Sequence, residues 1–173
     1  MARQLWLLRH AEAEPHGARP DAERKLTSRG EGQARAAGVA LARIGADFDA
    51  VLFSPKARAR QTAELAAEQW SANGHQRLEV HEPLAGGFDA RQALEELSGI
   101  APDGRLLIVG HEPDMSRVVS ELTGARVDLK KGGLAVVRLE GVGGELVVLM
   151  RPRELALIAD PAVRAVVLPA RGE

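Results

Sequence analysis

Short apolar runs alternate along this chain with longer segments of helical periodicity, and this alternation restricts the fold more than any other feature. The apolar runs predict strands, because four to six consecutive apolar residues suit a strand that is buried on both faces. The segments between them carry apolar residues on one helical face and begin with helix-capping residues. We predict strands at 4–8, 50–53, 78–81, 105–109, 134–140 and 145–150, and helices at 27–43, 54–70, 89–98, 113–123 and 153–159.

Strands that alternate with helices are typical of an α/β protein with a mostly parallel sheet. The fold class that we predict is a three-layer α/β/α sandwich with helices on both faces of the sheet. The last two predicted strands flank the sequence "GVGG", which suits a hairpin turn and predicts an antiparallel edge. We expect a single domain over 1–160 and a C-terminal tail over 161–173, because no linker or internal repeat divides the chain.

The starts of two helices carry specific signals. Thr27 or Ser28 is suited to cap the helix over 27–43, and Asp89 to cap the helix over 89–98. Ser54 followed by Pro55 predicts that the second helix begins there, with serine as its N-cap and proline at its first position.

Composition narrows the range of functions. The chain has 173 residues, a net charge of −1 and no cysteine, so disulfides, thiolate catalysis and cysteine zinc sites are excluded. A nearly neutral chain has no overall field to attract nucleic acid or a membrane surface. The amino-terminal apolar run is too short for a signal segment or a membrane span. We therefore expect a cytoplasmic protein that binds neither nucleic acid nor membrane; the oligomeric state stays open.

The ends of three predicted strands carry histidine and arginine. Arg9 and His10 follow the first strand, Arg58 lies in the first turn of the helix after the second, and His111 follows the strand at 105–109. Ligands of open α/β sheets bind beyond the carboxyl ends of the strands. A single histidine in such a place is usually an ordinary loop residue, but two histidines and two arginines at three strand ends indicate an oxyanion site.

Phosphate is the oxyanion that this set of residues suits. Arginine neutralises phosphoryl oxygens and stabilises their charge in the transition state. Histidine can act as a covalent nucleophile provided that its imidazole is neutral, and neighbouring arginines disfavour the imidazolium form. A hydrogen bond from one ring nitrogen to a backbone carbonyl would determine which nitrogen attacks.

Metal chemistry is the alternative use of histidine. No pair of histidines has HxH or HExxH spacing, and arginines would repel a divalent cation. Neither a GxxxxGK[ST] loop nor a GxGxxG loop follows the first strand, so those nucleotide-binding sites are absent. We expect neither a metal nor a cofactor. The histidines of the chain are His10, His16, His75, His81 and His111.

Four motifs in order, "LLRHAEAE", "RKLTSRG", "FSPKARARQTAE" and "LLIVGHEP", resemble those of the histidine phosphatase superfamily. That resemblance implies a phosphoglycerate-mutase-like fold, which agrees with the α/β pattern. The short length and the sequence "RHAEA" are most similar to the small bacterial phosphohistidine phosphatases of the SixA type. The resemblance covers most of the chain, since the motifs span residues 5–113 and the strand pair at 134–150 also fits.

The resemblance also implies catalytic roles. His10 matches the phosphorylated nucleophile, and Arg9 beside it matches the first phosphate-binding arginine. Arg58, within the pattern Ser-Pro-x-x-Arg-Ala-x-Gln-Thr, matches the second. His111 matches the second histidine of the family, which binds phosphate and stabilises the transition state.

Arg24 and Arg60 differ in what the resemblance implies for them. Arg24, in "RKLTSRG", matches an arginine that lines the pocket in this subgroup, which makes it a candidate substrate-binding residue. Arg60 lies outside the family pattern, so we expect it to be an ordinary residue of the helix surface.

Two positions depart from the family pattern. Ala11 replaces the glycine of the Arg-His-Gly motif, a small change. Gly86, in "EPLAGGFDA", stands where many relatives carry a general-acid glutamate. An alkoxide leaving group needs a proton, and general acid catalysis contributes about 10²–10⁴-fold in rate. The imidazole of a phosphohistidine leaves more easily, so the missing acid favours cleavage of P–N bonds.

The function predicted from the sequence is therefore hydrolysis of phosphohistidine on a partner protein through a phospho-His10 intermediate. Two alternatives stay open. One is a phosphomonoesterase that uses the same nucleophile on a small phosphate ester. The other is a phosphate-binding module without turnover.

Overall fold

A computed structural model describes residues 2–70, 77–141 and 143–162 of the chain. Its centre is a six-stranded sheet in the order β3-β2-β4-β1-β5-β6. The first four of these strands are parallel, whereas β5 runs antiparallel to β1 and β6 antiparallel to β5. The strands are β1 (Arg3–Arg9), β2 (Ala50–Phe53), β3 (Arg77–Val80), β4 (Arg105–Gly110), β5 (Leu134–Glu140) and β6 (Gly143–Met150). The predicted mostly parallel sheet with an antiparallel edge is confirmed.

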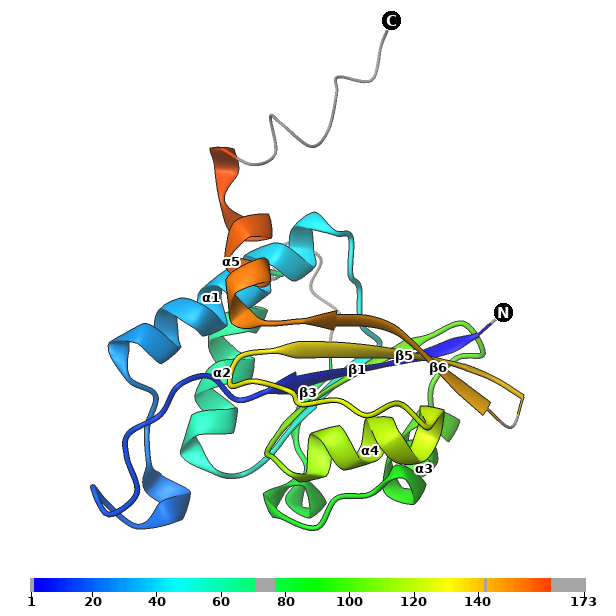
Figure 1. Cartoon of the computed structure of the whole chain (residues 1–173), viewed down its shortest axis with the longest axis horizontal. Helices are drawn as coiled ribbons and strands as arrows, with labels where there is room; N and C mark the ends of the chain where they lie inside the picture. The colour runs from blue at the N-terminus through cyan, green and yellow to red at the C-terminus, as the bar shows by residue number, and fades with distance from the viewer. Residues whose placement is uncertain (1, 71–76, 142, 163–173) are drawn as a thin grey trace, which may run out of the picture.

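Helices cover both faces of the sheet and make the three predicted layers (Figure 1). One face packs against α1, α2 and α5, and the other against α3 and α4. None of the described helices is long and apolar enough to cross a membrane. The helices are α1 (Ser28–Arg43), α2 (Ala57–Ala67), α3 (Ala90–Ser98), α4 (Asp114–Thr123) and α5 (Pro152–Ala159).

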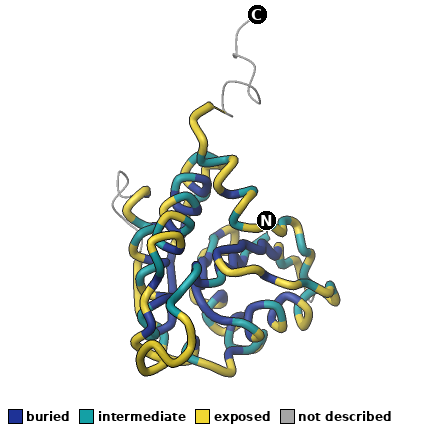
Figure 2. The backbone as a smooth tube through the Cα atoms, turned by 60° about the vertical axis from the view of Figure 1, so that its left-hand side comes forward, coloured by how far each residue is buried: buried dark blue, intermediate teal, exposed yellow. Residues whose placement is uncertain are grey.

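Strand β1 shows why the apolar runs are continuous. Its side chains alternate between the two faces, so Trp6 and Leu8 pack in one core, while Leu5 and Leu7 pack in the other. Both faces of a central parallel strand are buried, and each position therefore needs an apolar residue. Figure 2 shows the centre of the sheet as buried, with exposed residues on the loops and on the outer sides of the helices.

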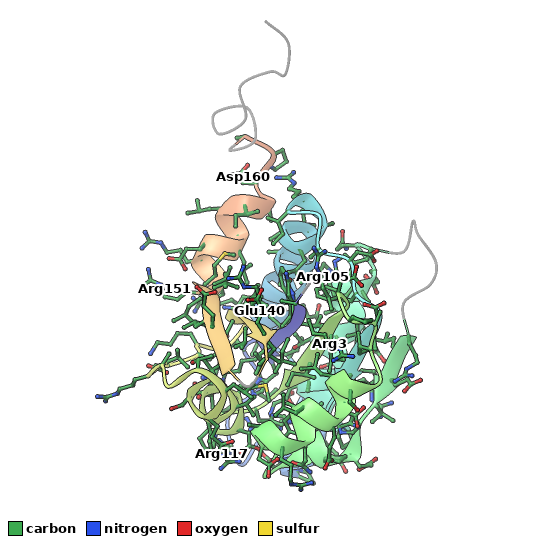
Figure 3. All side chains as sticks on the ribbon, turned by 90° about the vertical axis from the view of Figure 1, so that its right-hand side faces the viewer. Arg3, Arg105, Arg117, Glu140, Arg151 and Asp160 are labelled. Carbon is green, nitrogen blue, oxygen red and sulfur yellow. The ribbon has the colours of Figure 1, made fainter. Side chains whose placement is uncertain are left out.

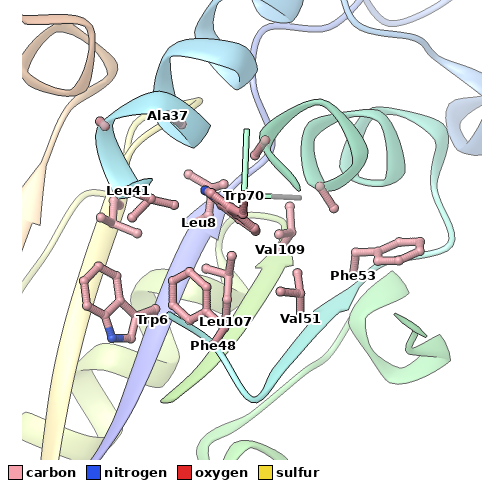
Figure 4. Packing of buried hydrophobic residues seen from close by; sticks show 14 of the residues in the cluster. Trp6, Leu8, Ala37, Leu41, Phe48, Val51, Phe53, Trp70, Leu107 and Val109 are labelled. Atoms are coloured by element: carbon pink, nitrogen blue, oxygen red, sulfur yellow. The ribbon is translucent and has the colours of Figure 1, made fainter. Parts of the chain in front are cut away.

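The core under α1 and α2 contains an aromatic cluster (Figure 4). Phe48 lies between Trp6 and Trp70, with ring centroids 5.4 Å apart in each pair. Its contact with Trp6 is edge-to-face, at an angle of 81°, an arrangement that aromatic rings favour. The indole nitrogen of Trp70 donates to the carbonyl of Gly38 at 2.9 Å, which joins the turn after α2 to α1.

The predicted start of the second helix is wrong. Helix α2 begins at Ala57, and its N-cap residue Lys56 makes no capping bond through its side chain. The Ser54 hydroxyl instead accepts the N–H of Lys56 at 3.2 Å, ahead of the helix, and lies 2.7 Å from the ring of His111 at the end of the neighbouring strand. The other two cap predictions are confirmed: the Thr27 side chain accepts from Gly30 N–H, and Asp89 forms a capping box with Gln92.

Two further predictions differ from the structure or fall outside it. Strand β6 begins at Gly143, so the second half of the predicted "GVGG" turn is strand. Of the predicted C-terminal tail, only residues 161 and 162 are within the described part of the chain.

A close approach between α1 and α2 provides a test of this packing. A Cβ atom on Gly38 would lie 2.3 Å from the carbonyl oxygen of Ala66. Gly38→Ala should therefore destabilise the protein by about 1–3 kcal/mol, although alanine favours helix formation. In the same helix, a Cβ on Gly32 meets nothing within 4 Å, so Gly32→Ala should stabilise by about 0.5–1 kcal/mol. Urea unfolding measures both, and equal effects of the two substitutions would contradict the packing.

Candidate functional site

The carboxyl ends of β1, β2 and β4 meet at one edge of the sheet. In the parallel register of β1 and β4, Arg9 lies opposite Gly110, and the backbone N–H of His10 donates to the Gly110 carbonyl at 3.0 Å. On the other side of β4, the N–H of Ser54 donates to the Val109 carbonyl, also at 3.0 Å. The backbone itself therefore brings together the three strand ends that the sequence singled out.

The two histidines at these strand ends lie against each other. The ring centroids of His10 and His111 are 5.2 Å apart, with the ring planes at 54°. Their side chains come from segments a hundred residues apart. Only 6% of the surface of His10 and 7% of that of His111 are exposed. Buried imidazoles of this kind are unusual unless packing or hydrogen bonds hold them.

A backbone carbonyl orients the His10 ring. Nδ1 of His10 lies 2.8 Å from the carbonyl oxygen of Ala11. A carbonyl oxygen only accepts, so in the neutral ring Nδ1 carries the proton and Nε2 is left with a lone pair. The Ala11 N–H in turn donates to the hydroxyl of Thr62 in α2 at 3.1 Å. His10 thus has a fixed orientation and a fixed basic nitrogen.

Both histidines are held in the neutral form. Burial lowers the pKa of His10 from 6.5 to about 3, and the nearby charges of Arg58, Arg9 and Lys131 add to that effect. Burial also lowers the pKa of His111 to about 3, with further contributions from His10 and Arg58. An unprotonated Nε2 on His10 at neutral pH is what a nucleophile requires.

Two guanidinium groups flank the histidine pair, that of Arg58 buried and that of Arg9 partly buried. Arg9 donates through Nη1 to the carbonyl of Leu129 at 2.9 Å, and Arg58 donates through Nη1 to the carbonyl of Asp21 at 2.7 Å. Burial lowers the pKa of each guanidinium below its usual value, although nearby carboxylates oppose the shift. Both remain charged at neutral pH because the pKa of arginine starts so high.

Sequence reasoning missed Asp21, whose carboxylate binds three cationic side chains. It accepts hydrogen bonds from Lys56 at 3.1 Å, from Arg24 at 2.9 Å and from Arg58 at 3.3 Å. The bond from Lys56 is the largest influence, and together these cations hold the pKa of Asp21 far below its usual range. Nothing in the sequence around Asp21 marks it, since its partners come from α2 and from its own loop.

Arg24 and Arg60 lie in different surroundings. Arg24 is 7% exposed and donates to the Asp21 carboxylate and to the carbonyl of Glu14. Arg58 donates to the same Asp21 carboxylate, so Asp21 links the two arginines. Arg60 is exposed on the surface of α2, with its guanidinium carbon 6.0 Å from the ring of Phe53.

Buried polar atoms without a partner gather at this edge of the sheet. Among the side chains that the structure describes, three buried nitrogen atoms have no hydrogen-bond partner: Nε of Arg9, Nε of Arg58 and Nδ1 of His111. Such orphaned atoms are rare in proteins and costly when nothing satisfies them. An oxyanion supplies the acceptor oxygens that the two arginine N–H groups lack. The arrangement is therefore suited to bind a tetrahedral oxyanion beside the lone pair of His10.

The opposite end of the sheet has a different character. A groove of about 790 Å³ lies there, between α3, α4 and the ends of β5 and β6, with Arg3 and Glu140 in its wall (Figure 3). None of the predicted site residues lines it. In the described residues, no three histidine, aspartate or glutamate side chains gather in a way that could hold a metal ion.

Comparisons with known proteins agree with the motifs. The family model of the histidine phosphatase superfamily (branch 1) matches residues 5–91, a span that includes Arg9, His10, Arg24 and Arg58 and ends before His111. An uncharacterized protein of Picosynechococcus sp. is 32% identical over 91% of this chain and 96% of its own length. A phosphohistidine phosphatase SixA homolog of Haemophilus influenzae is 27% identical over 84% of this chain and 93% of its own length.

A solved structure extends the similarity to the fold. The protein histidine phosphatase SixA, complexed with tungstate, superposes with a TM-score of 0.75 at 26% identity. The superposition covers 88% of this chain and 99% of that one. The phosphoglycerate-mutase-like architecture expected from the motifs is therefore confirmed.

The neutral state of the two histidines can be measured directly. With pKa values lowered to about 3, the rings of His10 and His111 should stay unprotonated from about pH 8 to pH 5, where an ordinary histidine gains its proton. NMR titration of the ring carbons, assigned with His10→Gln and His111→Gln, should show constant shifts for both rings in that window. A midpoint near 6.5 for either ring would contradict the burial argument.

Proposed function

The chain belongs to the histidine phosphatase superfamily, and on that premise we propose that it hydrolyses phosphohistidine on a partner protein through a covalent intermediate at His10. The observation that carries the proposal is the His10 ring, whose Nδ1–H is held by the Ala11 carbonyl. That bond leaves Nε2 as the reactive atom. Two arginines flank it, and their buried Nε–H groups have no partner and are available for the phosphoryl oxygens.

In the first step, Nε2 of His10 attacks phosphorus, and the P–N bond to the substrate imidazole breaks. The bonding electrons leave with that imidazole, which departs as the neutral ring when its other nitrogen has taken a proton from solvent. His10 then carries the phosphoryl group on Nε2 and a proton on Nδ1. The Ala11 carbonyl stabilises this positively charged ring, and Arg9 and Arg58 would neutralise the phosphoryl oxygens.

In the second step, water attacks phosphorus, and the bond to Nε2 breaks. The electron pair returns to Nε2, which restores the neutral ring with its proton on Nδ1. The protons of the attacking water leave with inorganic phosphate and solvent. His10 therefore cycles between two states that share the same Nδ1–H bond, and the backbone need not rearrange.

The carboxylates around the site favour a leaving group that needs no dedicated acid. Gly86 is exposed and offers no side chain at the position where relatives carry a glutamate. Asp21 cannot donate a proton near neutral pH, because three cations keep it ionised. Asp114 is also engaged, since it accepts the N–H groups of Gly87 and Phe88. An alkyl ester would find no general acid in Gly86, Asp21 or Asp114, whereas a phosphohistidine would not depend on one.

The substrate class can be tested with a protein that carries chemically formed phosphohistidine, beside aryl and alkyl phosphate esters. We expect kcat/KM for the phosphohistidine protein to exceed that for alkyl esters by about 100-fold or more, the size of the missing acid contribution. The rate of phosphate release gives kcat/KM for all three substrates. A preference for an alkyl ester would support the small-molecule alternative, and binding of phosphate without turnover would support the binding module.

In the same assay, His10→Ala should abolish turnover and leave the fold intact. The wild-type enzyme should form an acid-labile, alkali-stable phosphoenzyme on rapid quenching, and the variant should form none. Activity of the variant within a few-fold of wild type would rule out His10 as the nucleophile.

Arg58 has a matched control two residues further along α2. Arg58→Ala should lower kcat/KM for an aryl phosphate by roughly 10²–10³-fold, because a charged hydrogen bond that strengthens in the transition state is removed. Arg58→Lys should recover little of this loss, since a point charge cannot reproduce the guanidinium fork. Arg60→Ala, on the exposed face of the same helix, should leave the rate nearly unchanged. Similar losses at Arg58 and Arg60 would point to a general charge effect.

A further inference from the structure

The contact between Ser54 and His111 goes beyond the residues of the family motifs that carry catalytic roles. The Ser54 hydroxyl oxygen lies 2.7 Å from Nε2 of His111. Ser54 follows β2 and is fully buried, while His111 follows β4, the strand that pairs with β2. The two side chains thus meet across neighbouring strand ends, where the backbone ladder determines their separation.

The hydrogens of this contact can be assigned by accounting for the Ser54 hydroxyl. Its oxygen already accepts the backbone N–H of Lys56 at 3.2 Å. Its single hydrogen needs an acceptor, because the group is buried. Nε2 of His111 is the only acceptor that the structure gives it among the described residues. The hydroxyl therefore donates to Nε2, and Nε2 carries a lone pair.

The proton of the neutral His111 ring must then be on the other nitrogen. A neutral imidazole has one N–H group, and with Nε2 as an acceptor that group is Nδ1–H. Nδ1 is one of the three buried nitrogens without a partner, and the other two belong to Arg9 and Arg58. In this tautomer all three orphaned atoms are donors.

We propose that Ser54 is a positioning residue that holds His111 in the Nδ1–H tautomer, so that the buried Nδ1 donates a hydrogen bond to a phosphoryl oxygen. The second half of this proposal rests on the proposed function. In the opposite tautomer Nδ1 would present a lone pair to the oxyanion and repel it. Ser54 thus determines the sign of the interaction between His111 and the substrate without touching the substrate itself.

A catalytic role for Ser54 itself fits the structure less well. A serine bonded to a histidine resembles a nucleophile with its general base. Ser54, however, has no exposed surface, and its oxygen is engaged by Lys56 N–H. His10 next to it has a free Nε2 and an ordered proton on Nδ1, so the nucleophilic role falls to His10.

NMR of the histidine ring nitrogens tests the tautomer without any need for activity. Long-range ¹H–¹⁵N correlations of the free wild-type protein at neutral pH, assigned with His111→Gln, should show His111 with its proton on Nδ1. In Ser54→Ala the proton should move partly or wholly to Nε2. A wild-type ring protonated on Nε2, or a ring whose tautomer is the same in Ser54→Ala, would overturn the proposal.

Kinetics test the consequence for the substrate. Ser54→Ala should lower kcat/KM for an aryl phosphate by about 10–100-fold, the size of loss seen when a group that orients a metal-binding histidine is removed. Thr123→Ala is the matched control, because the Thr123 hydroxyl likewise accepts the N–H two residues further along the chain, at 3.0 Å, but lies away from the site, at the end of α4. That variant should keep full activity, and urea unfolding should show that both variants are folded under the assay conditions.

The two readouts separate this proposal from the proposed function. A shifted His111 tautomer with kcat/KM within twofold of wild type would overturn the donation to phosphate. A wild-type enzyme without phosphatase turnover would remove the proposed function, while the tautomer measurement would still decide the role of Ser54. Phosphate recovered on Ser54 after quenching would make Ser54 the nucleophile and overturn both assignments.

Discussion

The parallel pairing of β1 with β4 is the constraint on which the candidate site depends. The ladder begins with Gln4 opposite Arg105 and ends with Arg9 opposite Gly110, and the N–H of His10 continues it by one bond. Both strands lie between two apolar cores, so a shift of one residue would move every side chain to the wrong face. The register that buries the leucines of β1 is thus the register that brings His10 against His111.

Burial also determines the chemistry of this edge. Water is largely excluded from the two imidazoles, so neighbouring cations act on them with little screening, and both rings stay neutral. The cations themselves are kept in place by groups outside the histidine pair: the Leu129 carbonyl holds Arg9, and Asp21 holds Arg58. A site of this kind is organised before a ligand arrives, which is the condition for electrostatic stabilisation of a transition state.

The loop between β1 and α1 connects the site with the helices behind it. Ala13 forms an isolated bridge with Leu26, and the N–H of Leu26 donates to the side chain of Gln61 in α2 at 2.8 Å. Gly30 in the first turn of α1 leaves room for the Glu12 carbonyl, which a Cβ would approach to 1.9 Å. These contacts hold the segment that carries Asp21 and Arg24, so the cluster of cations around Asp21 depends on how α1 and α2 pack.

The sequence by itself determined the strands, most helix boundaries and the residues grouped at the strand ends, because periodicity and capping are local properties. Only the tertiary structure decided what those residues do to one another. Ser54 has the local pattern of a helix cap, yet its hydroxyl bonds to His111, which is 57 residues away. Asp21 is not marked by any local motif, and two of its three cationic partners, Lys56 and Arg58, reach it only when the loop packs against α2. Hydrogen bonds and ion pairs between distant segments depend on distance and direction in space, and neither is encoded in the spacing of residues along the chain.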